Sequence, residues 1–281
     1  MSDKLSDIEL LPPLREVIRT HDLHARKKFG QNFLLDLNIT DKIARRAAVK
    51  DRNVIEIGPG PGGLTRSLLL AGADHLTVFE VDENVLPALQ EIKRLAGSKL
   101  TIHCRNALNV EYDEFPTGSI IVANLPYNVA TPLLIKWLRI IHTSPQAISS
   151  LTLMFQREVA DRILAEPGDK DYGRLSVLAG WLCRGRKEFD LPPGAFWPPP
   201  KVTSSVVHLV PHDLAETGKP AFETVEALTA RAFGKRRKML RASLKDYRSL
   251  MTELEIDETL RPEQLSRVDF LRLANKLDQA D

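Results

Sequence analysis

Between residues 53 and 156 the chain alternates short apolar runs with amphipathic segments, and this alternation restricts its fold more than any other feature. The runs NVIEI (53–57), HLTVFEV (75–81), KLTIH (99–103), SIIVA (119–123) and SSLTLMFQ (149–156) predict buried strands. GLTRSLLLAG (63–72) and PLLIKWLRII (132–141) predict helices between or after them. Strands that alternate with helices favour a mostly parallel sheet with helices on both faces, an α/β fold of the Rossmann-like type.

The pattern changes after a polar stretch at 210–221, VPHDLAETGKPA, which is typical of a linker. Before this stretch, 174–183 suggests a further helix and 204–210 a late strand. After it the sequence is charged and helical, without strand signals. We therefore predict an N-terminal lead-in over 1–25, an α/β domain over 26–212 and a small all-helical domain over 213–281.

Composition excludes several classes of protein. Of 281 residues 43% are hydrophobic, which is enough for a core, and the formal net charge of +2 identifies no polyanionic partner by itself. The two cysteines, Cys104 and Cys183, form no metal-binding pair with each other, and we expect no metal. The first ten residues lack the apolar core of a signal peptide, and no segment is apolar enough to span a membrane. We expect a cytoplasmic protein.

A glycine-rich loop, EIGPGPGGLT (56–65), follows the first predicted strand. Its spacing Gly58-x-Gly60-x-x-Gly63, with Glu80 twenty residues after Gly60, fits a site in which the loop approaches a ligand and a carboxylate binds the ribose. The spacing alone suits either a nicotinamide cofactor or S-adenosylmethionine. Prolines at 59 and 61 have no N–H to offer a pyrophosphate, and this favours S-adenosylmethionine, which has no phosphate.

The strand at 119–123 runs into Asn124-Leu125-Pro126-Tyr127. The carboxyl end of such a strand lies at the ligand crevice of an open parallel sheet, so the Asn124 amide should face the site. Its oxygen and the Leu125 carbonyl, held extended by Pro126, can accept hydrogen bonds from an exocyclic amine. The Tyr127 ring can stack on the base. This quartet predicts a pocket that orients an adenine amine toward an electrophilic methyl group.

A group of cations near the C-terminus predicts a nucleic-acid contact. Arg237, Arg241, Lys245 and Arg248 recur at helical spacing and would share one face of a helix, with Leu240 and Leu244 packed on the other. We predict that phosphates bind at Lys235, Arg236, Arg237, Lys238 and Arg241.

Several motifs in order resemble the bacterial small-subunit ribosomal RNA adenine-N6,N6-dimethyltransferase family. They are KKFGQNFLLD, EIGPGPGGLT, LTVFEVD, IVANLPYNVATPLL, YGRLSVLAGW, PPGAFWPPPKVTSSVV and FGKRRKMLRASL. The resemblance implies S-adenosylmethionine-dependent dimethylation of two adjacent adenosines in the 3′-terminal hairpin loop of 16S rRNA, within the assembling small subunit, by a monomer. It also implies a set of cofactor-binding residues: Asn32, Leu34, Gly58, Gly60, Glu80, Val81, Asn106, Ala107 and Asn124.

One cofactor position departs from the family pattern. Members usually have an acid where this chain has Asn106, which keeps an acceptor for the cofactor's adenine amine but loses the charge. Three alternatives stay open: an antibiotic-resistance dimethylase of large-subunit RNA, a non-catalytic RNA-binding assembly factor, and a nicotinamide oxidoreductase. The motifs FWPPPKVTSSVV and FGKRRKML speak against the large-subunit dimethylase. The intact Asn-Leu-Pro-Tyr speaks against a non-catalytic assembly factor. Tyr127 and the basic C-terminal segment speak against an oxidoreductase.

Overall fold

The structure is a computed structural model that describes residues 3–26, 30–111, 116–212, 220–235 and 237–280. Its main feature is a seven-stranded sheet in the order β4-β3-β2-β5-β6-β9-β7. The strands are β2 (Asn53–Ile57), β3 (His75–Glu80), β4 (Leu100–Cys104), β5 (Ser119–Asn124), β6 (Ile148–Gln156), β7 (Cys183–Leu191) and β9 (Ser204–Pro211). Strands β4, β3, β2, β5 and β6 are parallel, and β9 pairs antiparallel with β6. The predicted mostly parallel α/β sheet is confirmed.

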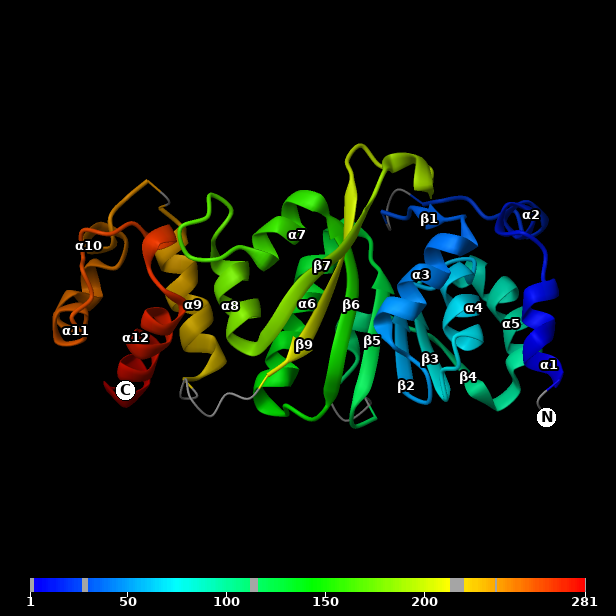
Figure 1. The fold of residues 1–281 in the computed structure, drawn as a ribbon, viewed down its shortest axis with the longest axis horizontal. Coiled ribbons are helices and arrows are strands. Elements are labelled where there is room, and N and C mark those ends of the chain that lie inside the picture. The colour runs from blue at the N-terminus through cyan, green and yellow to red at the C-terminus, as the bar shows by residue number, and fades with distance from the viewer. Residues whose placement is uncertain (1–2, 27–29, 112–115, 213–219, 236, 281) are drawn as a thin grey trace. The chain divides into compact units, whose positions relative to one another are not determined.

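Apolar side chains explain why these segments pair and pack. Successive residues of a strand face opposite sides of a sheet, and β2 and β5 are buried on both sides because both sides are covered. Ile121 and Val122 of β5 are completely buried. Helix α3 (Leu37–Ala47) precedes β2, whereas α4 (Gly63–Leu70), α5 (Leu86–Ala96) and α6 (Tyr127–Thr143) come after β2, β3 and β5. Figure 1 shows the central strands β2, β5 and β6 side by side.

The predicted lead-in contains α1 (Asp3–Ser6) and α2 (Leu14–Thr20) and contributes to the core. Ile8, Leu14 and Val17 are buried. The buried Arg66 of α4 donates from Nη1 to the Pro12 carbonyl at 2.7 Å. Burying each of these aliphatic side chains stabilises the fold by roughly 1.5–3 kcal/mol. The N-terminal segment is therefore held against the α/β unit by apolar packing and by this hydrogen bond.

The chain divides into two compact units. The first contains residues 1–157 and 186–210, and the second contains 158–185 and 211–281. The second unit is built from α7 (Arg157–Leu164), α8 (Arg174–Leu182), α9 (Phe222–Phe233), α10 (Leu240–Ser243), α11 (Arg248–Glu253) and α12 (Arg267–Ala280).

These units differ from the predicted ranges 26–212 and 213–281 because 158–185 groups with the C-terminal helices. Ring contacts within the second unit give the reason. Trp181 of α8 stacks on Phe222 of α9 with ring centroids 6.1 Å apart, and Tyr172 packs edge-on against Phe233 of α9 at 5.9 Å. The assignment of catalysis to one domain and RNA binding to the other stays a prediction.

No helix in the described part of the chain is long and apolar enough to cross a membrane.

Candidate active site

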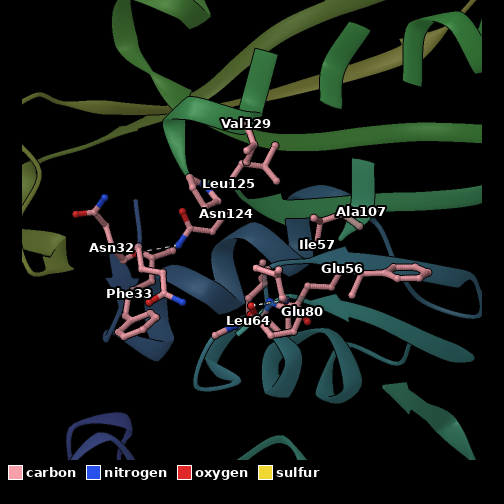
Figure 2. A pocket seen from close by; sticks show the side chains of 18 of the residues that line it. Asn32, Phe33, Glu56, Ile57, Leu64, Glu80, Ala107, Asn124, Leu125 and Val129 are labelled. Atoms are coloured by element: carbon pink, nitrogen blue, oxygen red, sulfur yellow. Dashed lines mark hydrogen bonds between the residues drawn. The ribbon is translucent and has the colours of Figure 1, made fainter. Parts of the chain in front are cut away.

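A cavity of about 240 Å³ opens at the carboxyl ends of β2, β3 and β5. Figure 2 shows its lining, with Glu56 and Ile57 from β2, Glu80 from β3 and Asn124 from β5. All nine predicted cofactor-binding residues and the whole Asn124–Tyr127 quartet line this one cavity. The rule that ligands bind at the carboxyl ends of parallel strands therefore located the cavity correctly. The role of each residue stays a prediction.

The glycine loop has the tight backbone that its sequence suggests. Gly58, Gly60 and Gly62 have φ angles of +69°, +53° and +89°, in the left-handed region that side-chain-bearing residues rarely adopt. The Gly62 amide donates to the Pro59 carbonyl at 3.0 Å, and α4 begins at the next residue. A Cβ atom on Gly60 would lie 3.1 Å from the Phe33 ring. The loop thus places bare backbone against the cavity.

Two buried carboxyl groups, Glu56 and Glu80, line the cavity beside this loop. Glu80 accepts hydrogen bonds from the amides of Gly60 (3.1 Å), Val81 (2.7 Å) and Asp82 (2.8 Å). Burial raises the pKa of Glu80, and these three bonds oppose the rise. Burial raises the pKa of Glu56 to about 8, against the opposing hydrogen bond that it accepts from Thr65 Oγ1 at 2.7 Å.

The lining disfavours a ligand that carries phosphate groups. Among the described residues, neither Glu56 nor Glu80 has a cationic ion-pair partner, and Arg105 is the one cation that lines the cavity. A pyrophosphate would meet two buried carboxyls and two prolines without N–H groups. S-adenosylmethionine has no phosphate, and the lining offers oxygen acceptors for its ribose hydroxyls and its amino groups, so the residues present fit that cofactor. Among the described residues, no group of three or more His, Cys, Asp or Glu side chains is placed to hold a metal.

The Asn124 amide is oriented by a residue far away in sequence. Its Nδ2 donates to the main-chain carbonyl of Asn32 at 3.2 Å, a bond drawn in Figure 2. This bond uses the amide nitrogen, so the Oδ1 atom is left as the acceptor. Among the hydrogen bonds of the described residues, none occupies the carbonyl oxygen of Leu125. The two predicted acceptors of an exocyclic amine are therefore available together.

Pro126 and Tyr127, which follow these two acceptors, begin helix α6. Pro126 caps α6 with φ −56° and ψ 131°, and Tyr127 is the first residue of that helix. The Tyr127 hydroxyl lies 2.7 Å from the Oγ of Ser204, the first residue of β9. This hydrogen bond fixes the far end of a half-buried ring, and burial raises the pKa of Tyr127. The ring is thus held rigidly at the cavity, as a stacking surface requires.

Asn106 caps the short helical turn Ala107–Asn109 that follows β4. Its Oδ1 accepts from the Leu108 amide at 3.0 Å. An amide oxygen has two lone pairs, so a second hydrogen bond from a ligand amine remains compatible with the cap.

Phe196 is a lining residue that the sequence analysis missed. It lies in β8 (Phe196–Trp197), which pairs antiparallel with β1 (Phe33–Leu34), and it is buried. Phe196 belongs to the run FWPPPKV, which we used above only as part of the resemblance to the dimethyltransferase family and not to predict a cavity residue. Glu56 was also missed, because a single carboxylate inside an apolar strand gives no spacing pattern to interpret.

The basic C-terminal residues do not form one helix. Helix α9 ends at Phe233, α10 begins at Leu240, and α11 begins at Arg248. The expectation that Arg237, Arg241, Lys245 and Arg248 share one helical face is therefore wrong. Long-range main-chain bonds, from the Leu240 amide to the Leu260 carbonyl at 2.8 Å and from the Arg241 amide to the Glu258 carbonyl at 2.9 Å, fix the break.

The predicted phosphate-binding cations are nevertheless solvent-accessible. Lys235, Arg237, Lys238 and Arg241 are exposed, and Arg236 lies outside the described residues. Leu240 and Leu244 are buried, as expected. Arg248, in contrast, is engaged by the Glu258 carboxylate through two hydrogen bonds of 2.7 and 2.6 Å.

Comparisons with known proteins agree with one another. A family model described as ribosomal RNA adenine dimethylase matches residues 22–279. A Brucella abortus protein named ribosomal RNA small subunit methyltransferase A is 53% identical over 275 residues, covering 95% of this chain and 98% of the relative. A protein of the same name from Azorhizobium caulinodans is 51% identical over 283 residues, covering 98% and 96%.

Solved structures show the same fold. A dimethyladenosine transferase from Plasmodium falciparum superposes with a TM-score of 0.73 at 26% identity, covering 87% of this chain and 96% of that one. The 23S rRNA methyltransferase ErmE superposes with a TM-score of 0.63 at 26% identity, covering 88% and 100%.

Proposed function

Because this chain belongs to the ribosomal RNA adenine dimethylase family, we propose that it uses S-adenosylmethionine to dimethylate two adjacent adenosines in the 3′-terminal hairpin loop of 16S rRNA. The reaction takes place on the assembling small subunit, in the cytoplasm, and the enzyme acts as a monomer. The observation that supports the proposal is the Asn124–Asn32 hydrogen bond, which engages the amide nitrogen and leaves Oδ1 at the end of β5 as an acceptor for an amine.

S-adenosylmethionine supplies an electrophilic methyl group on a cationic sulfur. Asn32, Leu34 and the glycine loop would hold the donor, and Glu80 would accept hydrogen bonds from its ribose. Asn106 accepts a hydrogen bond from the donor's adenine amine. Asn124 Oδ1 and the Leu125 carbonyl accept from the substrate N6 amine and direct its lone pair at the methyl group. Tyr127 stacks on the substrate base. The donor would supply its methyl group as the C–S bond breaks and the N–C bond forms, and the amine would lose its proton to water.

Positioning supplies most of the rate in this scheme. A neutral, oriented amine that attacks in line needs no strong base, and the described lining contains no histidine. For the second methylation the amine has one remaining N–H, which donates to one of the two acceptors after rotation about the C6–N6 bond.

The experiment that tests the proposal is methylation of unmodified small and large ribosomal subunits with labelled donor. We expect label in the small subunit alone. Label in the large subunit would instead assign the activity in the name of ErmE. Absence of label from both, with donor still bound, would indicate the non-catalytic assembly factor.

Asn106→Asp should keep or strengthen donor binding. A carboxylate retains the cap on Leu108 and accepts the donor's amine with a charge-assisted bond, roughly twice as strong as a neutral one. Calorimetric titration of both proteins measures this, with Asn109→Asp, on the same turn but outside the cavity lining, as the matched control. Tenfold weaker binding by Asn106→Asp alone would show that the pocket depends on the amide.

We propose that the exposed cations of the second unit bind RNA phosphates, because they are solvent-accessible in a unit that lacks the reaction pocket. Replacing Arg237, Lys238 and Arg241 by Gln should weaken subunit binding and lower its salt dependence. Each lost phosphate contact should reduce the slope of log K against log salt by roughly 0.7–0.9. Donor binding should not change.

Arg248→Gln is the matched control for this triple variant, because the Arg248 guanidinium is already engaged by Glu258. It should change the slope much less. An unaltered slope in the triple variant would mean that these cations form only a solvated surface.

A further inference from the structure

Trp197 differs from the other two tryptophans of this chain. Trp137 and Trp181 are each 1% exposed, whereas Trp197 is 40% exposed. Tryptophan is usually buried because of its large apolar area, and exposed tryptophans are enriched at binding interfaces.

The position of Trp197 is fixed by the two-stranded sheet beside the cavity. Phe33 pairs with Trp197 and Leu34 pairs with Phe196. Phe33, Leu34 and Phe196 all line the cavity, and Trp197 is the member of this sheet that does not. The Trp197 ring packs against the Phe33 ring, with centroids 6.5 Å apart and planes inclined by 24°. The indole is therefore braced by a cavity wall and presents its remaining surface to solvent.

The chemistry of this exposed surface suits a nucleobase. An indole offers a flat π-face, and stacking on aromatic side chains is how proteins bind single-stranded bases. Trp197 is the residue directly after Phe196, which lines the cavity, so their Cα atoms lie about 3.8 Å apart. An RNA that places one base in the cavity has its neighbouring bases one nucleotide away. Lys201, exposed four residues later, adds a cation that suits the connecting phosphates.

We propose that Trp197 stacks on the base next to the adenosine that occupies the cavity. This inference rests on the proposed function and adds to it, since it assigns a place to the second of two adjacent adenosines while the first reacts. Trp197 is a positioning residue for the RNA and does not contact the methyl donor.

Fluorescence measures the contact directly, because Trp197 is the exposed tryptophan and the other two are buried. A hairpin RNA with two adjacent loop adenosines should quench the emission of the wild-type protein. Trp197→Phe keeps an aromatic face and should bind the hairpin nearly as well, as measured by anisotropy of labelled RNA. Trp197→Ala should bind roughly 5- to 150-fold more weakly, the range expected for loss of one base stack. The matched control, Val202→Ala, removes another exposed apolar side chain of the same loop and should bind normally.

Hairpins with an abasic nucleotide on either side of the target adenosine test which base is involved. If Trp197 stacks on the base next to the target adenosine, one of the two abasic hairpins should no longer quench the tryptophan fluorescence. Wild type and Trp197→Ala should then bind that abasic hairpin equally well. Additive losses with both hairpins would overturn the inference. So would normal binding of the intact hairpin by Trp197→Ala.

Methylation of small subunits distinguishes failure of the Trp197 proposal from failure of the proposed function. If wild type and Trp197→Ala both methylate with the same KM, the proposed function stands and Trp197 has no part in it. If wild type transfers no methyl group to RNA, the proposed function itself fails, whatever the fluorescence shows.

Discussion

Asn124→Ala should lose about 10²–10³ in the rate of methyl transfer while remaining folded. The variant lacks the acceptor at the end of β5 that we propose orients the amine, and a positioned contact of this kind acts mainly in the transition state. Single-turnover transfer to small subunits measures the rate, and circular dichroism checks the fold. Near-normal transfer by a folded variant would contradict the role of Asn124.

Asn124→Asp is the matched variant for the orientation of this side chain. It keeps oxygen acceptors but removes the Nδ2–H that donates to the Asn32 carbonyl, and so places a carboxylate oxygen against a carbonyl oxygen. We expect a rate between those of wild type and the Ala variant. A rate equal to that of wild type would show that the bond to Asn32 is not needed.

Glu56→Gln should make the protein more stable than wild type, and increasingly so as the pH rises. Burial raises the pKa of Glu56 from 4.5 to about 8, so between these values the folded state holds a proton that the unfolded state has released. The stability of wild type therefore falls as pH rises through this interval, by up to about 1.4 kcal/mol for each pH unit. Gln is neutral at every pH and can still accept the hydrogen bond from Thr65.

Urea unfolding of both proteins at pH 6 and pH 8 measures the effect. The gap in unfolding free energy should widen by on the order of 2 kcal/mol between these values. Glu9→Gln, at an exposed position, is the control and should show no such widening. A gap for Glu56→Gln that does not depend on pH would mean that Glu56 is ionised throughout.

The α/β core was predictable because its signals are local. Apolar runs mark β2, β3, β5 and β6, and turn residues separate them from helices, so strand type and direction follow from periodicity. β7, with the sequence CRGRKEFDL, could not be recognised in this way. It is an edge strand whose residues 184–187 are exposed, and exposed charges on an edge carry no alternating pattern.

The helical unit shows the limit of local reasoning more clearly. Helix α8 was expected from its sequence, but its grouping with α9 depends on the stacking of Trp181 on Phe222. The break between α9 and α10 depends on main-chain bonds to residues 258 and 260. Helical spacing of the cations could not reveal these tertiary contacts, and they displaced the continuous helix that the spacing suggested.

The site was predictable in position but not in its internal bonds. The carboxyl-end rule brought Gly58, Glu80 and Asn124 together correctly. The hydrogen bond between Asn124 and Asn32 joins residues 92 positions apart, and no pattern in the sequence points to it. Phe196 lines the same cavity because β8 pairs with β1. A strand of two residues is too short to give a recognisable pattern in the sequence.

The most direct test of the central claim is mass spectrometry of the 3′-terminal hairpin of 16S rRNA, after small subunits that lack the modification are incubated with this protein and S-adenosylmethionine. We expect both adjacent loop adenosines to become N6,N6-dimethyladenosine, and neither to do so with Asn124→Ala. Modification of any other base, or unmodified adenosines after incubation with a folded, donor-bound wild-type protein, would contradict it.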